Sequence, residues 1–256
     1  MNALALEFPP VSHLVEWPAI FFEDTPIEVN KVVLINLGAL VATVLLFYLA
    51  GRKSALVPTG VQNVAESSLE FIENSVILQT IGPDGLHFLP FLTTMFFFVL
   101  FTNITEILPF LQFPGNARMA IPVFLALLVW VIYNVIGVRT QGFGGYLKST
   151  LFPPGVPGAL KPLVALIEFV STFIVRPFSL AVRLFANMLA GHLLLVTFAV
   201  LSAALFAKNL LIVVLPFSFA MLVFLTAFEV LVAFLQAFIF TILTAVYIGG
   251  AMHPEH

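Results

Sequence analysis

The sequence predicts an all-α polytopic membrane protein, with about five membrane-embedded helices and one amphipathic surface helix in a single domain over residues 1–256. Hydrophobic residues make up 61% of the chain and charged residues 9%, and the mean hydropathy is +1.12. Soluble domains carry about a quarter charged residues. Several apolar runs are long enough to cross a bilayer, and they are continuous rather than alternating, which favours helices over a β-barrel.

The composition also excludes several kinds of function. The chain has no cysteine, which rules out disulfides, thiolate chemistry and zinc–thiolate sites, and we expect neither a metal nor a cofactor. A net charge of −3 without a basic patch gives no support for a nucleic-acid partner. No phosphate-binding glycine-rich loop is present, so ATP chemistry is not expected in this chain.

The first two segments set the expected topology. Residues 1–28 are acidic and broken by proline, and we expect an extracytoplasmic lead without a cleavable signal peptide, because MNALALEFPP lacks a cationic region. Residues 29–50 form the first predicted span. Arg52 and Lys53 follow it directly, so the positive-inside rule places this end in the cytoplasm and the N-terminus outside.

Residues 60–80 predict an amphipathic helix on the cytoplasmic surface. Apolar residues recur at helical spacing, while Glu66, Glu70 and Glu73 follow another face. The stretch is too polar to cross a bilayer. Its apolar face is expected to pack either on its own domain or against a partner helix.

Residues 87–138 predict a helical hairpin. The second crossing, 87–110, ends in NITEILPF, QFPGNAR forms a tight outer turn, and the third crossing, 119–138, returns to the cytoplasm. Residues 139–160 then form a Gly/Pro-rich cytoplasmic loop, whose two basic residues lie on the side that the positive-inside rule expects.

Residues 161–250 predict a long, steeply tilted helical hairpin. The runs 162–207 and 210–248 contain no convincing turn. At 1.5 Å per residue each would be roughly 60–70 Å long, against a hydrocarbon thickness of about 30 Å, and a tilt of about 20° cannot absorb that excess. Each run is therefore two crossings with a hidden turn or one strongly inclined helix. We predict inclined helices that reverse at the polar break Lys208–Asn209.

The main functional signal is a set of polar residues inside this hairpin. An ionisable group in a bilayer costs from about 3 to over ~10 kcal/mol, so it needs a partner, an aqueous cavity or a function. Arg183 has no carboxylate three or four residues away, and its guanidinium keeps its charge. Its counter-ion must come from Glu168, from another segment or from another subunit. The set comprises Glu168, Arg176, Arg183, Asn187, His192, Glu229 and Gln236.

The polar residues of the hairpin lie at matching depths. Facing residues in an antiparallel pair have residue numbers with a constant sum, and a turn at 208–209 predicts a sum near 417. Arg183 with Gln236 gives 419, and His192 with Glu229 gives 421. The directions in which these side chains point agree less well with the pairing. Residues nine apart, such as Arg183 and His192, lie on opposite faces of an ideal helix.

Two pairs of residues indicate a proton path. His192 and Glu229 predict a relay, because imidazole titrates nearest to neutral pH; a histidine that only packs is the alternative. Asn103 and Glu106 share one face of the second crossing near its outer end, where helix-end polarity is the alternative.

The assigned topology separates these residues by depth. The relay pair and Glu106 lie in the outer half of the membrane, and Glu168 lies in the inner half. The fixed charge of Arg183 stands between the two regions. Arg176 precedes a proline near the inner headgroups, where snorkelling is its expected role.

The segment RPFSLAVRLFANMLAGHLL, together with LQAFIFTILTAVYI, resembles the a subunit of F-type ATP synthases, the stator part of the membrane motor. NITEILP resembles the outer-channel motif of that family, and the similarity covers most of the chain. The resemblance implies near-horizontal long helices and two offset aqueous half-channels facing a rotating ring of c subunits. Protons enter one half-channel, neutralise a ring carboxylate, travel with the ring and leave by the other.

The resemblance also implies roles for single residues. Arg183 matches the essential arginine, which pairs with the ring carboxylate and blocks leakage, and Asn187 and Gln236 match its neighbours. Glu168 corresponds to an acid of the inner proton path. In some members the acid and the histidine of the outer path are exchanged. On the outer path the resemblance places Asn103, Glu106, His192 and Glu229.

The expected partners are the c-subunit ring, the b subunits of the peripheral stalk, other ATP synthase subunits and membrane lipid. The chain itself is expected to be non-catalytic. Its charge asymmetry fits a bacterial inner membrane with the C-terminus in the cytoplasm; an organelle inner membrane is the alternative. A rival function is a secondary transporter in which Arg183 binds an anionic substrate, but this predicts an internal repeat, and none is evident. A structural scaffold leaves the matched depths unexplained.

Overall fold

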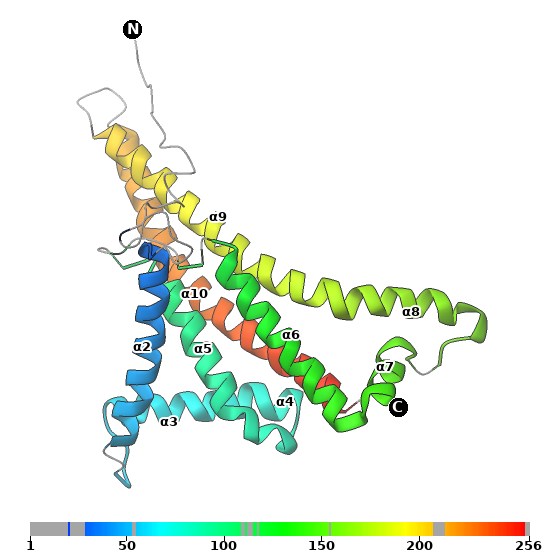
Figure 1. Ribbon diagram of the computed structural model, residues 1–256. Coiled ribbons are helices and arrows are strands. Elements are labelled where there is room, and N and C mark those ends of the chain that lie inside the picture. Colours follow the sequence, from blue (N-terminus) through cyan, green and yellow to red (C-terminus); the bar gives the residue numbers. More distant parts are fainter. Residues whose placement is uncertain are drawn as a thin grey trace.

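The computed structural model describes most of the chain, and its elements are helices (Figure 1). The predicted lead, apart from Ile20, and the break at Lys208–Asn209 lie outside the described residues. The described residues are 20, 29–52, 55–108, 111, 115–116, 118–153, 155–206 and 213–253.

Five helical stretches of the described chain are long and apolar enough to cross a membrane, which confirms the all-α polytopic class. The last two are 48 and 38 residues long, whereas a span needs about 20. The five stretches are α2 (Lys31–Arg52), a 3₁₀ turn (Pro83–Phe88) that continues into α5 (Leu89–Ile104), α6 (Ala120–Gln141), the stretch Gly158–Leu205, and α10 (Leu215–Met252).

The predicted amphipathic segment is helical and packs on its own domain. It consists of α3 (Val61–Ile72), a π-helical turn (Glu73–Ile77) and α4 (Leu78–Thr80). In Figure 1 it lies across the lower ends of α2 and α5. Ile72, Val76 and Ile77 are fully buried.

The predicted loop at 139–160 contains a further helix, α7 (Phe143–Leu151), that folds back onto α6. A Cβ atom at Gly137 of α6 would clash with the Tyr146 ring, so only glycine lets α7 approach this closely. The Tyr146 hydroxyl donates to Asn134 Oδ1 at 3.0 Å. Burial raises the pKa of Tyr146 above its usual range, so the phenol remains a donor. The glycines around Tyr146 hid this helix in the sequence.

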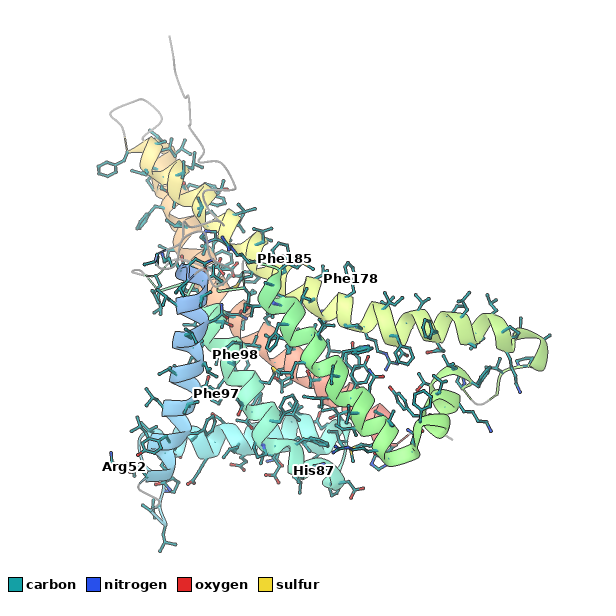
Figure 2. The ribbon with its side chains drawn as sticks, viewed as in Figure 1. Arg52, His87, Phe97, Phe98, Phe178 and Phe185 are labelled. Atoms are coloured by element: carbon teal, nitrogen blue, oxygen red, sulfur yellow. The ribbon has the colours of Figure 1, made fainter. Side chains whose placement is uncertain are left out.

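Aromatic side chains fill the space between α2, α5 and α10. Phe97 of α5 is labelled in Figure 2. Its ring lies beside that of Phe47 of α2, with ring centroids 5.4 Å apart. Phe96 meets Phe234 of α10 edge to face at 5.7 Å. Such pairs hold the three helices in one core.

The stretch Gly158–Leu205 and α10 form the long antiparallel hairpin. The first arm contains a 3₁₀ turn (Gly158–Leu160), α8 (Lys161–Val170), a π-helical turn (Ser171–Val175) and α9 (Arg176–Leu205). In Figure 1 the hairpin crosses the bundle obliquely. Helix α8 projects from the bundle at the end of the first arm that lies away from Leu205.

Two contacts fix the register of this hairpin. Ser202 Oγ lies 2.8 Å from Ser218 Oγ, and Gly191 lies directly against the Glu229 carboxylate. The residue numbers of each pair add up to 420. This sum is slightly higher than the predicted 417. The reason is that α9 ends at Leu205 and α10 begins at Leu215, which centres the reversal slightly later than 208–209.

Candidate functional site

Arg183 lies on an exposed part of α9. Leu180, Leu184 and Met188 are buried against the other helices, whereas the side chain of Arg183 is exposed and that of Asn187, one turn later, is partly exposed. Among the described residues Arg183 forms no ion pair with any acid, Glu168 included. Of the three predicted sources of a counter-ion, neither Glu168 nor another segment supplies one within the described chain.

A second group of polar residues lies about nine residues further along α9. His192 of α9, Glu106 of the turn after α5 and Glu229 of α10 are each at least 93% buried; we call them the histidine cluster. Glu106 Oε1 lies 3.7 Å from His192 Nδ1. A cavity of about 200 Å³ opens beside Glu106 and His192, and Thr226 also lines it. The structure therefore adds Glu106 to the pair of His192 and Glu229 that the sequence predicted.

Gly191 explains how Glu229 reaches this cluster. A Cβ atom at position 191 would lie 2.6 Å from Glu229 Oε1 and 2.7 Å from Oε2. The carboxylate therefore rests against the backbone of α9, next to His192 in the chain. This contact reconciles the matching depths of the hairpin residues with their different directions.

Asn103 connects the end of α5 to the turn before α6. It is 2% exposed, and its Oδ1 accepts a hydrogen bond of 3.0 Å from Asn116 Nδ2. Asn116 also donates to Thr102 Oγ1 at 3.1 Å. On α2, Asn36 donates to Gly115 O at 3.0 Å. Sequence reasoning missed Asn36 and Asn116, although an amide in an apolar first span was a usable signal.

A larger cavity lies at the other end of α9. It measures about 540 Å³ and is lined by Glu168, Thr172, Arg176 and Tyr247, among others; we call it the Arg176 cavity. The Arg176 guanidinium carbon lies 5.4 Å from the centre of the Tyr247 ring, within the range of a cation–π contact. Sequence reasoning gave Arg176 a snorkelling role, whereas here it lines the same cavity as Glu168.

The π-helical turn before Arg176 shapes this cavity. A π-turn adds a residue to the helix and leaves a carbonyl in need of a donor, and such turns are frequent at functional sites. The Tyr133 hydroxyl of α6 donates to Thr172 O at 2.7 Å within the turn. Tyr133 therefore stabilises the change of direction that brings Arg176 and Glu168 to the same cavity.

Gln236 of α10 lies between the two polar regions. It is 5% exposed, and its Nε2 donates to no acceptor in the described residues. It stands seven residues from Glu229, so the two share one face of α10. Within the described ranges no group of His, Asp and Glu is arranged to hold a metal ion.

Comparison with known proteins identifies the family to which the chain belongs. The family model for the ATP synthase A chain matches residues 32–249. Similar proteins named ATP synthase subunit a occur in Rhodococcus erythropolis, with 43% identity over 93% of this chain and 88% of the relative, and in Frankia alni, with 40% identity over 94% and 83%. A third, from Maricaulis maris, is 43% identical over 84% of this chain and 85% of the relative. The chain therefore belongs to the ATP synthase A chain family.

Proposed function

We propose that this chain is the proton-translocating stator subunit of a rotary F-type ATP synthase, in which two offset half-channels face the c-subunit ring. Membership of the family and the names of the relatives support a place in the membrane sector of that complex. The observation that carries the proposal is the position of Arg183. Its exposed side chain, without an ion pair in the described chain, lies along α9 between the histidine cluster and the Arg176 cavity.

The histidine cluster forms the outer half-channel in this proposal. Glu106, His192 and Glu229 are buried together beside a cavity, and carboxyl and imidazole groups can each accept and release a proton. The imidazole favours protons over sodium ions as the transported species. Asn103 holds the adjoining turn in place through its bond with Asn116.

The Arg176 cavity forms the inner half-channel. Glu168 supplies an acid there, and the cavity is wide enough, at about 540 Å³, to hold water. At 1.5 Å per residue, Arg183 stands roughly 10 Å along α9 from Arg176 and roughly 13 Å from His192. A proton that moves along α9 from one region to the other would have to pass the guanidinium.

Arg183 performs two tasks in this arrangement. Its charge stabilises the ionised ring carboxylate while that carboxylate faces it, which promotes proton loss at that point. The same charge repels protons that would cross directly between the half-channels. Asn187 and Gln236 lie at neighbouring positions, on α9 and α10, where they can orient the guanidinium or the ring carboxylate.

The topology of the proposal follows from the charges at the helix ends. Arg52 ends α2, Arg139 lies in the last turn of α6, and Lys148 lies in α7. In Figure 1 these ends lie toward the same side as the C-terminus. The positive-inside rule makes that side cytoplasmic, in the plasma membrane of a bacterium, with the b subunits of the stalk as further partners.

Replacing Arg183 tests the proposal. In the assembled synthase, Arg183→Ala is expected to conduct protons passively while ATP synthesis falls to background, because the barrier and the carboxylate partner are lost together. Arg183→Lys is expected to restore little, since a lysine loses its charge more readily in a desolvated place. Both activities are measured in vesicles, with Arg139→Ala at the exposed end of α6 as the control. Continued coupled synthesis in Arg183→Ala would refute the assignment.

A further inference from the structure

A histidine directly after α10 lines the Arg176 cavity and is also open to solvent. His253 borders the cavity, while 57% of its side chain is exposed. Its Nε2 lies 3.7 Å from Oδ2 of Asp84, whose side chain is 74% exposed. Asp84 belongs to the 3₁₀ turn before α5. The two residues, which we call the mouth pair, therefore lie where the cavity meets solvent.

Several contacts hold the end of α10 at this place. A Cβ atom at Gly249 would lie 2.7 Å from Thr80 O, so the backbone of α10 rests directly on α4. At the end of α6, Gln141 Nε2 donates to Ala251 O at 2.8 Å. The His253 backbone N–H donates to Gly249 O at 2.9 Å. The exposed imidazole is therefore carried by a backbone that neighbouring helices hold in position.

Stability gives little reason for the mouth pair, whereas its chemistry suits proton exchange. Both side chains are more than half exposed, and exposed ion pairs add little to folding. Imidazole gains and loses a proton between pH 5 and 8, and a carboxylate beside it favours the protonated form. The other charged or titratable groups that line the same cavity are Tyr133 of α6, Tyr146 of α7, Glu168 of α8, Arg176 of α9 and Tyr247 of α10.

The mouth pair joins the cavity to the surrounding solution. Within the cavity, Glu168 supplies an acid and Arg176 a fixed positive charge. His253 touches the same space, and Asp84 stands on its solvent side. Free hydronium is scarce near neutral pH, so a half-channel that exchanges protons quickly with the cytoplasm benefits from a group that soluble buffers can protonate and deprotonate.

We propose that His253, assisted by Asp84, exchanges protons between the Arg176 cavity and soluble buffers of the cytoplasm. This inference rests on the proposed function, in which the cavity is the inner half-channel. For a proton that leaves, a hydronium ion in the cavity protonates one ring nitrogen and remains as water. The imidazolium then gives the proton on its other nitrogen to a buffer base and becomes neutral again. Proton uptake follows the same steps in reverse.

Soluble buffer tests the proposal because it can replace the side chain. The assembled synthase is placed in inverted vesicles, so that its cytoplasmic side faces the medium, and ATP-driven proton uptake is measured. In dilute buffer, His253→Gln is expected to take up protons several-fold more slowly than the wild type. A concentrated sulfonic-acid buffer that does not cross the membrane is expected to restore the wild-type rate, because it delivers protons directly to the cavity.

His87 provides the matched control. It is labelled in Figure 2 and lies in the same 3₁₀ turn as Asp84, but it does not line the cavity. His87→Gln is therefore expected to take up protons at the wild-type rate in dilute and in concentrated buffer.

Asp84→Asn is the second variant. Without the carboxylate the protonated imidazole is less stable, so uptake in dilute buffer is expected to fall less than in His253→Gln, and the loss should grow as the pH rises. Wild-type uptake by both variants in dilute buffer would overturn the proposal. Slow uptake by His253→Gln that concentrated buffer does not restore would also overturn it, since that pattern indicates a structural defect. Arg183→Ala tests the stator assignment separately, because it changes neither residue of the mouth pair.

Discussion

At the scale of single residues, the site depends on close contacts that a larger side chain would disrupt. Gly191 is the clearest example, because the oxygens of Glu229 occupy the place where any other residue would carry its Cβ atom. Arg183 is the opposite case, a side chain to which the described chain offers no acid. Gly191 makes room for a carboxylate of this chain, whereas the proposed function has Arg183 present its charge to the c-subunit ring.

Gly191→Ala tests the first of these features. The added methyl group is expected to displace the Glu229 carboxylate, to reduce proton flux several-fold, and to destabilise the chain by about 1–3 kcal/mol through overpacking. Flux is measured in vesicles and stability by denaturant titration. Gly38→Ala on α2 is the matched control, because nothing lies within 4 Å of a Cβ atom there. Shortening the acid in a second variant, Gly191→Ala with Glu229→Asp, should recover part of the flux; no recovery would count against steric displacement.

The sequence predicted some of these residues and missed others for a physical reason. Arg183 stands out in the sequence because the charges within one helical turn can be read directly. The pairing of His192 with Glu106 depends on how the end of α5 meets α9, and spacing along one hairpin carries no information about a third helix. Asn36 and Asn116 were missed for the same reason, since their partners lie about 80 and 13 residues away.

At the scale of elements, apolar runs located the long helices, but local irregularities escaped. Each predicted span overlaps a long apolar helix, because burial in lipid requires continuous apolar sequence. The two π-helical turns have the same composition as an α-helix, so nothing in the pattern distinguishes them. The turn at Ser171–Val175 matters most, because it sets the direction in which Glu168 and Arg176 point.

Tyr133→Phe tests the importance of that turn. Loss of the hydroxyl leaves the buried Thr172 carbonyl without its donor, which costs about 1–3 kcal/mol and favours a return to regular α-helix. Glu168 and Arg176 then no longer share the cavity, and proton flux is expected to fall several-fold. Flux and thermal stability are measured beside Tyr48→Phe as the control, because Tyr48 is 61% exposed on α2. Wild-type values for both in Tyr133→Phe would show that the bond does not set the turn.

At the scale of the whole molecule, the long hairpin leaves one of its faces without a partner in the described chain. Large apolar side chains of α8 and α9 remain exposed, such as Leu166 at 62% and Phe178 at 63%, and Figure 2 shows Phe178 projecting away from the bundle. Lipid can cover such apolar side chains. The hydrocarbon of a lipid offers no partner to Arg183, which is exposed on the same helix. In the proposed function, an acid of the c-subunit ring fills that place.

The last prediction concerns the position of the c-subunit ring relative to this chain. Because the chain has no cysteine, Asn187→Cys places one thiol a single turn from Arg183, and it is expected to cross-link with a cysteine introduced beside the ring carboxylate of the assembled synthase. Tyr48→Cys on α2 is equally suited to reaction, since position 48 is exposed. It is expected to give no cross-link, because the proposed function places the ring against α9 and not against α2. The products are resolved by gel electrophoresis. Cross-linking from position 48 and none from 187 would place the ring on the wrong face, and the exposed guanidinium would then need a different acid.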